Sequence, residues 1–539
     1  MHEAKPEALR APVNFNFAAD VVDRWAKVRP ESSALWHADA GTGAEQKFSF
    51  RQMAALSRQA ANFLRDSGVQ RGDRVLLMLP RVPEWWIAML GLIRLGAVPV
   101  PATLLLTARD VAYRLKNAQV HAAITNEEGI PKVGDFSAIR ILVNSHAPGK
   151  TELPGGWLDF GRGVRGASTR FRRERTRSDD PGILYFTSAT TGEPKMVLHT
   201  QASYGLGHLL TGRYWLDLGP EDLHWNISDL GWGKAAWSSF FGPWHMGACV
   251  FALDVIGKFD PVLTLDTLAR YPITTWCAPP TALRLIVRQD LSRWRFPHLR
   301  HCVTAGEPLN PEVLNLWRNA TGLTLHEAYG QTETVVLIGN CRSLNFPVRP
   351  GSMGKPVPGY TLALLDEHLR EVPPGTEGEV AIRVKPKPPV GLFSEYWLNP
   401  EEAAHKFAGD WYLTGDRAIR DADGYFWFVG RKDDVIKSSG YRIGPFEVES
   451  VLMEHPSVLD VAVIGKPDPL RGQIVKACVV LRPGVGASEE LKAELQTHCK
   501  RLIAAYKYPR EIEFVKELPK TTSGKTRHVA LREAAAVAG

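Results

Sequence analysis

The chain is organised around one stretch toward its C-terminal end, residues 411–449, which reads WYLTGDRAIRDADGYFWFVGRKDDVIKSSGYRIGPFEVE. Asp416 follows Thr-Gly at the end of a predicted strand, where a carboxylate can be held in place, and residues 421–424 (DADG) are typical of a hairpin turn. Residues 431–434 (RKDD) form a dense charge cluster. Residues 445–453 then read as a helix, with Pro in the first turn. Taken alone, this pattern also fits an ordinary hairpin, an exposed loop and a helix.

The length and composition indicate a globular protein with more than one core. A chain of 539 residues is too long for a single hydrophobic core, so we expect at least two domains. With 44% hydrophobic and 23% charged residues, it can bury large cores. The net charge of +7 permits anionic small molecules and does not require nucleic acid. The six cysteines show no C-x-x-C spacing, so neither a zinc site nor a disulfide framework is predicted.

Three segments bear on location and partners. Residues 1–17 carry acids and no apolar core, unlike a signal peptide. The apolar residues 85–106 are interrupted by Arg94 and two prolines, which favours a buried helix and strand over a membrane span. The basic residues 161–177 hold few stacking aromatics, which favours a solvated loop over a nucleic-acid arm. We therefore expect a cytoplasmic protein with no transmembrane segment and no nucleic-acid partner, and the oligomeric state stays open.

Apolar strands alternate with helices in the first part of the chain. Strands are predicted at residues 74–80, 97–101 and 121–125, and helices at residues 49–67, 84–95 and 107–117. Such alternation is typical of βαβ units and a parallel sheet. Residues 351–384 read as β structure, and short strands surround one helix near the C-terminal end. We predict an α/β fold with a large N-terminal domain of parallel-rich sheets, helices and a β subdomain, and a small α+β C-terminal domain.

Three loops follow predicted strands and carry the polar residues of greatest interest. The first, residues 187–195 (TSATTGEPK), offers hydroxyls, a glycine and a lysine, which suit phosphate, although such a loop is often only a turn. It is not a Walker A loop, because G-x-x-x-x-G-K-[ST] is absent. The others are residues 305–308 (AGEP) and 328–333 (AYGQTE). Because ligands lie beyond the carboxyl ends of strands in an open α/β sheet, we expect the three loops to face one cleft.

Together these loops resemble the adenylate-forming enzyme superfamily, which comprises acyl-CoA synthetases, adenylation domains of peptide synthetases and luciferases. Six motifs carry the resemblance in the expected order: TSATTGEPK (187–195), AGEP (305–308), AYGQTE (328–333), TGD (414–416), GRKDDVIKSSGYRI (430–443) and PKTTSGKTRH (519–528). It covers nearly the whole chain. The segments WNISDLGWGKAAW, GEPLNP and SSGYRIGPFEVES are similar to those of medium-chain acyl-CoA synthetases.

The resemblance implies a two-step reaction that uses ATP, Mg²⁺ and coenzyme A (CoA) as co-substrate. A carboxylate attacks the α-phosphorus of ATP to give an acyl-adenylate and pyrophosphate, and the CoA thiol then displaces AMP to form a thioester. An AMP-forming synthetase for a medium-chain or related acid is the function we expect. Alternatives are an aryl-acid CoA ligase and an adenylation module that loads a carrier protein. A non-catalytic nucleotide-binding protein is disfavoured because Lys195, Glu333, Asp416 and Lys525 are all present.

The resemblance also implies the residues that bind ATP. For the phosphates these are Thr187, Ser188, Ala189, Thr190, Thr191, Gly192, Glu193, Pro194 and Lys195. Ala189 departs from the usual glycine, which would strain the loop if its φ is positive. Adenine and the α-phosphate would contact Gly306, Glu307, Pro308, Glu327, Ala328, Tyr329, Gly330, Gln331 and Thr332. Glu333 would bind Mg²⁺, and Asp416, supported by Arg431, would accept hydrogen bonds from the ribose.

The acid, CoA and the domain motion are implied in the same way. Lys525 would stabilise charge on the attacking carboxylate and the α-phosphate, and Lys437 would act in thioester formation. With the phosphate-binding Thr187 and the Mg²⁺ ligand Glu333, they are the candidate catalytic residues. The acyl pocket would be walled by Trp232, Gly233, Ala236, Trp237 and Gly330. CoA would meet Ser439, Gly440, Tyr441, Arg442, Arg471, Tyr508 and Arg510. The C-terminal domain, residues 433–539, would rotate at Asp433 against residues 1–432.

Overall fold

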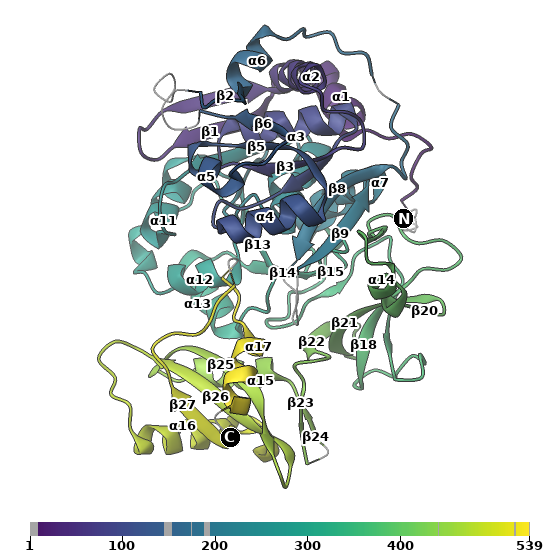
Figure 1. The fold of residues 1–539 in the computed structure, drawn as a ribbon. Coiled ribbons are helices and arrows are strands. Elements are labelled where there is room, and N and C mark those ends of the chain that lie inside the picture. The colour runs from purple at the N-terminus through teal and green to yellow at the C-terminus, as the bar shows by residue number, and fades with distance from the viewer. Residues whose placement is uncertain are drawn as a thin grey trace.

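The computed structural model describes residues 9–144, 153–173, 175–187, 194–439, 441–521 and 524–537. The protein is built from mixed sheets and helices, as the predicted α/β class requires. One large body, coloured from purple to green in Figure 1, stands above a smaller yellow-green body formed by the end of the chain.

Five parallel strands form the first sheet, in the order β4-β3-β5-β6-β7. Ser49 caps the N-terminus of helix α2 through a reciprocal pair of hydrogen bonds with Gln52. Helix α3 packs closely against α2 because Gly91 has no side chain; a Cβ there would lie 2.7 Å from Ala60 Cβ. The bounds are β3 Arg74–Met78, β4 Val98–Pro101, β5 Val120–Thr125, β6 Ile139–Leu142, β7 Trp157–Asp159, α2 Phe50–Asp66 and α3 Pro83–Leu95.

The second sheet has nine strands, in the order β16-β15-β14-β13-β12-β10-β11-β1-β2. Its middle strands pair in parallel, and β2, β15 and β16 pair antiparallel at the edges. The carboxyl ends of β10, β12, β13 and β14 therefore meet at one edge. The bounds are β1 Ser33–Asp39, β2 Glu45–Ser49, β10 Leu223–Asn226, β11 Cys249–Asp254, β12 Thr275–Cys277, β13 His301–Ala305, β14 Leu325–Tyr329, β15 Ile338–Gly339 and β16 Lys355–Pro356.

The strand before the predicted phosphate loop belongs to neither parallel sheet. β8 (Pro181–Thr187) pairs antiparallel with β9 (Lys195–Thr200), which pairs antiparallel with β19 (Glu395–Tyr396). This pairing places Thr187 opposite Lys195. We had expected this loop to follow a strand of an open parallel sheet, and that expectation was wrong. Thr187 instead ends a strand of an antiparallel pair.

The β subdomain is the antiparallel sheet β17-β18-β21-β20, with β22 also paired to β21. The predicted hairpin at residues 421–424 joins β21 and β22, and Gly424 takes a φ of 86° there, which suits glycine. Asp421 closes the turn by accepting hydrogen bonds from the backbone N–H of Asp423 and Tyr425. The bounds are β17 Leu362–Leu365, β18 Glu377–Arg383, β20 Phe407–Ala408, β21 Trp411–Arg420 and β22 Phe426–Arg431.

The end of the chain forms a separate sheet, β24-β23-β26-β25, with β27 also paired to β26. It has its own hydrophobic core, in which Val448 and Leu452 of α15 pack with Val463 and Leu495. Helix α15 spans the residues predicted for it. The bounds are β23 Ile436–Ser438, β24 Tyr441–Ile443, β25 Val458–Asp468, β26 Gly472–Leu481, β27 Glu511–Phe514, α15 Pro445–Met453, α16 Glu489–Leu502 and α17 His528–Val537.

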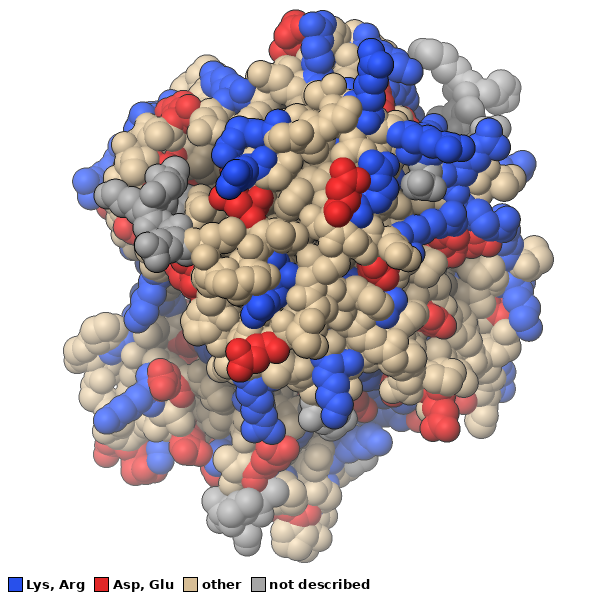
Figure 2. All heavy atoms as spheres, turned by 45° about the horizontal axis from the view of Figure 1, so that its top comes forward, with Lys and Arg blue, Asp and Glu red and all other residues tan. Residues whose placement is uncertain are grey.

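Basic side chains of the predicted basic segment, residues 161–177, are partly neutralised by acids. Arg173 donates to both carboxylate oxygens of Asp20, at 2.7 and 2.9 Å, and Arg177 pairs with Asp179. Figure 2 shows red side chains among the blue ones on one face of the molecule. Within the described ranges, no helix is both long and apolar enough to cross a membrane.

Candidate active site

A cavity of about 390 Å³ lies at the carboxyl edge of the second sheet. Residues beyond β10, β12, β13 and β14 line it, together with the end of β8. Of the residues predicted to form the site, those lining it are Thr187, Trp232, Gly233, Trp237, Gly306, Glu307, Gly330, Gln331, Thr332 and Lys525. Thr187 at the start of the first loop and residues of the other two loops thus line one cavity, although Thr187 comes from a separate sheet.

Asp416 sits at the centre of a buried polar network. Its Oδ2 accepts hydrogen bonds from the Tyr329 hydroxyl and from Gln331 Nε2, both at 2.6 Å. Arg431, opposite it on β22, places Nε 4.0 Å from Oδ1. Burial raises the pKa of Asp416 above its ordinary value, while the hydrogen bond from Tyr329 and the charge of Arg431 act in the other direction. A buried carboxylate held in this way keeps lone pairs for hydroxyl donors.

Glu333 and Lys195 both contact Tyr396. The Tyr396 hydroxyl donates to Glu333 Oε1 at 2.7 Å. Lys195 Nζ lies 5.5 Å from the centre of the Tyr396 ring and is ion-paired with Glu402 of α14 (Pro400–Lys406). Glu402 was not predicted from the sequence, because an acid in a charged helix carries no distinguishing signal. Tyr396 therefore contacts both the half-buried carboxylate of Glu333 and the ammonium of Lys195.

The strand-end loops of β13 and β14 are fixed to one another. Gly306 takes a φ of 105°, which suits glycine. The backbone N–H of Leu309 donates to Glu327 Oε1 at 3.2 Å, and Glu327 Oε2 has no hydrogen-bond partner among the described residues. Burial raises the pKa of Glu327 to about 8. Glu307 is placed near Arg284, with 3.6 Å between Oε2 and Nη1.

His199, on β9, holds the loop after β14 and was missed in the sequence. Its Nε2 donates to the Thr332 carbonyl at 2.7 Å, since a carbonyl can only accept. Its Nδ1 lies 3.0 Å from the Ser203 hydroxyl, which donates to it. Burial lowers the pKa of His199 to about 3, so the ring is neutral. This histidine orients Thr332 from behind the cavity.

Two tryptophans and two glycines shape the apolar side of the cavity. Trp237 Nε1 donates to the Tyr204 hydroxyl at 2.8 Å, which fixes the indole. A Cβ on Gly330 would lie 2.5 Å from the Trp237 ring, so glycine is needed for this close approach. Ala236 is buried in the core beside Trp237 and does not appear among the lining residues.

Lys525 and Lys234 reach the same cavity from different parts of the chain. Lys525 belongs to the C-terminal body, where Thr521 Oγ1 accepts from its backbone N–H at 3.1 Å. Gly524 packs beside Thr281, which also lines the cavity. Lys234 was not predicted, because a lysine in GWGKAAW reads as an ordinary helical residue. Its Nζ donates to the Ala305 carbonyl at 2.9 Å.

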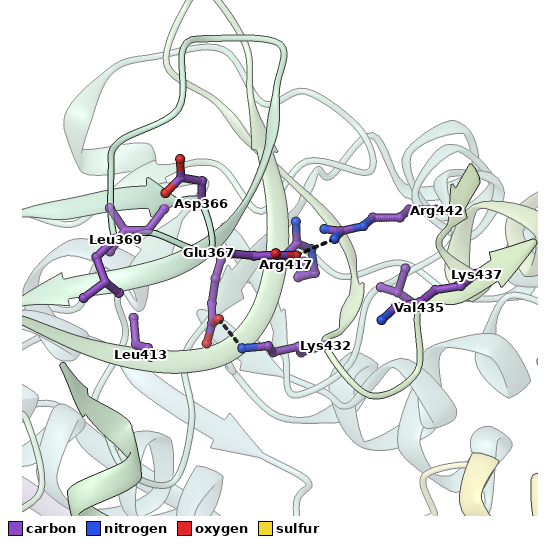
Figure 3. A pocket seen from close by; sticks show the side chains of 11 residues that line it. Asp366, Glu367, Leu369, Leu413, Arg417, Lys432, Val435, Lys437 and Arg442 are labelled. Carbon is purple, nitrogen blue, oxygen red and sulfur yellow. Dashed lines mark hydrogen bonds and ion pairs between the residues drawn. The ribbon is translucent and has the colours of Figure 1, made fainter. Parts of the chain in front are cut away.

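Among the described residues, those predicted to bind CoA do not line this cavity. Lys437 and Arg442 line a second pocket, of about 110 Å³, between the β subdomain and the β23–β24 hairpin (Figure 3). There Arg442 Nη2 lies 2.7 Å from Glu367 Oε1, and Lys432 Nζ lies 3.2 Å from Glu379 Oε2.

The remaining CoA candidates are spread over the small body. Ser439 and Arg471 are hydrogen-bonded, with Arg471 Nη1 3.2 Å from Ser439 Oγ. Tyr441 stacks on Tyr506, with ring centres 4.1 Å apart. Arg510 Nη1 donates to the Tyr508 hydroxyl at 3.2 Å. Asp433 is exposed in the turn between β22 and β23. The predicted residues Ser188, Ala189, Thr190, Thr191, Gly192, Glu193 and Gly440 lie outside the described residues.

Sequence comparison places this chain among named enzymes. The family model for AMP-binding enzymes matches residues 22–397, and that for the AMP-binding enzyme C-terminal domain matches residues 447–525. The chain is 46% identical to acyl-coenzyme A synthetase ACSM3 of Mus musculus and 49% identical to acyl-coenzyme A synthetase ACSM4 of Homo sapiens. Each alignment covers 97% of this chain and 91% of the relative. Both relatives are named mitochondrial, which contradicts the expectation of a cytoplasmic protein; that expectation was wrong.

Solved structures agree with this assignment. The anthranilate CoA ligase AuaEII in complex with anthranoyl-AMP matches with a TM-score of 0.88 at 32% identity, over 98% of each chain. A benzoate CoA ligase from Burkholderia xenovorans LB400 matches with a TM-score of 0.83 at 27% identity, over 96% of this chain and 100% of that one. The chain therefore belongs to the AMP-binding enzyme family and, within it, to the acyl-coenzyme A synthetases.

Proposed function

We propose that this protein is an AMP-forming acyl-CoA synthetase that activates a medium-chain or related carboxylic acid with ATP and transfers the acyl group to CoA. One observation carries the proposal: a single cavity is lined by Lys525, by Gln331 and Thr332, and by Trp232 and Trp237. A cation, polar groups for a nucleotide and apolar walls for an acyl chain thus meet where a carboxylate and an α-phosphate would react.

The nucleotide would lie along the ends of β13 and β14. Asp416 would accept hydrogen bonds from the ribose hydroxyls, with Tyr329 and Gln331 holding its orientation. Such charge-assisted hydrogen bonds contribute about 1.5–3 kcal/mol each. Thr332, positioned by His199, would bond the α-phosphate.

Glu333 fits a role as the protein ligand of Mg²⁺. It offers a half-buried carboxylate bonded to Tyr396, whose ring also contacts Lys195, the lysine expected to contact the phosphates. Across the described residues, no group of three or more His, Cys, Asp or Glu side chains could hold a metal, so phosphate oxygens would complete the shell. When bound, Mg²⁺ would neutralise charge on the phosphate oxygens.

The first step would depend on Lys525. Its ammonium would stabilise the negative charge that the carboxylate and the α-phosphate bring together in the cavity that Lys525 lines. Proton transfer is not required, because the attacking oxygen is already a carboxylate. Pyrophosphate leaves as the acyl-adenylate forms.

The second step would need a different arrangement of the C-terminal body. Arg442 and Lys437 line the smaller pocket in Figure 3 and not the cavity that contains Lys525. A rotation of residues 433–539 at the exposed turn of Asp433 would withdraw Lys525 and bring the β23–β24 hairpin toward the acyl-adenylate. We place the boundary between the two domains at this turn.

Two classes of acid are candidates for the substrate, aliphatic and aromatic. Medium-chain acids are favoured by the likeness to acyl-coenzyme A synthetases at 46–49% identity, whereas the solved structures named anthranilate and benzoate CoA ligases are 32% and 27% identical. Pyrophosphate–ATP exchange across a panel of straight-chain, benzoic and amino acids tests this. We expect the highest rates with medium-chain acids and release of AMP when CoA is added. Exchange with none of these acids would refute the enzyme assignment, and release of ADP would refute the mechanism.

A further inference from the structure

Lys234 occupies a place that no predicted role explains. It follows Trp232 and Gly233, the two lining residues that begin the short helix α9 (Gly233–Ala236), and it lines the cavity itself. Two hydrogen bonds hold the loop before it in place. Asp229 accepts one from the Thr103 hydroxyl at 2.9 Å and one from the Gly231 N–H at 2.8 Å. Lys234 thus belongs to the fixed part of the cavity, whereas Lys525 comes from the C-terminal body.

The ammonium of Lys234 has hydrogen-bonding capacity left over. It can donate three hydrogen bonds, and within the described parts of the chain its acceptor is the Ala305 carbonyl. No carboxylate of the described residues is ion-paired with it. Burial lowers the pKa of Lys234, and the charge of Lys525 lowers it further, while Glu307 acts in the opposite direction. Two lysines therefore face one cavity. An anion between them would reduce the repulsion between their charges and accept hydrogen bonds from the free N–H groups of Lys234.

The position of Lys234 identifies which anion this is. Its partner Ala305 ends β13 and precedes Gly306 and Glu307, on the nucleotide side of the cavity. Lys234 and Lys525 line the same cavity, so an anion held between them would lie at the reacting end of the acid.

We propose that Lys234 is the carboxylate-binding residue of the fixed domain, which grips the acid from the side opposite Lys525. This inference rests on the proposed function. The two lysines would then have different roles. Lys234 binds the carboxylate before and during attack. Lys525 stabilises the α-phosphate and then moves away with the C-terminal domain. A charge-assisted hydrogen bond of this kind corresponds to a tenfold to hundredfold effect on binding of the acid.

The test compares an acid with its uncharged counterpart. The ligands are the best acid of the panel and the primary alcohol of the same chain length, which keeps the apolar tail and lacks the carboxylate. In Lys234→Met we expect the KM for the acid in pyrophosphate–ATP exchange to rise about tenfold to a hundredfold. Inhibition by the alcohol and the KM for ATP should stay within about twofold of wild type. Lys234→Arg should retain most of the preference for the acid, because it keeps the charge.

Controls separate this inference from a structural role and from failure of the proposed function. Lys116→Met removes an exposed lysine of α4 (Ala108–Asn117) and should change none of these values. A change in the KM for ATP with an unchanged acid-to-alcohol ratio would show that Lys234 only braces Ala305, and would overturn the proposal. If Lys234→Met does not fold, Lys234→Gln is compared with Lys234→Arg in the same assays, and equal acid preference in those two variants also overturns it. Wild-type protein that shows no acid-dependent exchange refutes the proposed function instead.

Discussion

Arg442 Nη2 lies 2.7 Å from Glu367 Oε1, so a residue expected to bind CoA is instead paired with the β subdomain. The two side chains are 40% and 72% exposed, which places the pair among surface ion pairs, whose contribution to stability is small. The contact joins the two bodies of the molecule in the arrangement that brings Lys525 into the cavity. With the domain rotation that we propose, this contact would favour the first half-reaction over the second by a small amount.

Glu367→Gln should ease the second half-reaction. Loss of this ion pair frees Arg442 and weakens one contact between the bodies, so we expect the KM for CoA to fall by about twofold to fivefold in thioester formation from supplied acyl-adenylate. The effect should shrink at high salt, because surface charges are screened. Glu371→Gln is the matched control, since Glu371 pairs with Arg420 inside the β subdomain. An equal change in that control, or a higher KM for CoA, would contradict the prediction.

Lys525→Ala should separate the two half-reactions. Removal of one positioned cation from a developing anionic transition state typically costs a factor of about 10²–10³. We expect that loss in pyrophosphate–ATP exchange, with thioester formation from supplied acyl-adenylate unchanged within about twofold. Lys516→Ala, at an exposed lysine of the same body, is the control. If both half-reactions of Lys525→Ala fell equally, rotation of the C-terminal domain would lose its support.

Local patterns predicted most of the secondary structure, and motif order predicted the loops of the cavity. Helix α15 begins and ends at the predicted residues, and the strands before Gly306 and Gly330 lie where their apolar runs indicate. These features depend on short-range periodicity and turn chemistry, which a single sequence carries.

Features that depend on long-range pairing could not be read in this way. The antiparallel partner of β8 and the contact of Arg442 with Glu367 depend on the arrangement of whole sheets and bodies. Lys234 and His199 were missed for another reason: a single lysine or histidine in an apolar segment looks the same whether it faces a cavity or packs in a core. Only the three-dimensional arrangement shows that Lys234 faces the cavity and that His199 holds Thr332.

Tyr329→Phe should move the acidic limb of activity to higher pH. The Tyr329 hydroxyl donates to Asp416 Oδ2 and thereby opposes the rise in the pKa of Asp416 that burial causes. Without that donor the pKa of Asp416 rises further, so its carboxylate is lost at a higher pH as pH falls. We expect the acidic limb of kcat/KM for ATP to shift upward and the KM for ATP at neutral pH to rise about tenfold.

Tyr425→Phe is the matched control for that change. Its hydroxyl donates at 2.6 Å to the Pro347 carbonyl, so the substitution removes an equally short hydrogen bond away from Asp416. The pH profile of this variant should follow wild type. A shift of the same size in both variants would show that the effect is a general loss of stability and not a change at Asp416.

Glu327→Gln should reduce the pH dependence of stability, so that the free energy of unfolding falls less as pH rises than in wild type. Burial raises the pKa of Glu327 to about 8 from an ordinary value of 4.5, so between these two values the folded state holds a proton that the unfolded state has lost. The free energy of unfolding therefore falls as pH rises across this window, by up to about 1.4 kcal/mol per pH unit from this group. Glutamine stays neutral, so Tm should fall less from about pH 6 to about pH 9 in Glu327→Gln than in wild type. Glu517→Gln, at an exposed carboxylate, should follow the wild-type curve. Parallel curves for wild type and Glu327→Gln would show that Glu327 is already ionised in the folded protein, and that its Oε2 has found a partner that stabilises the charge.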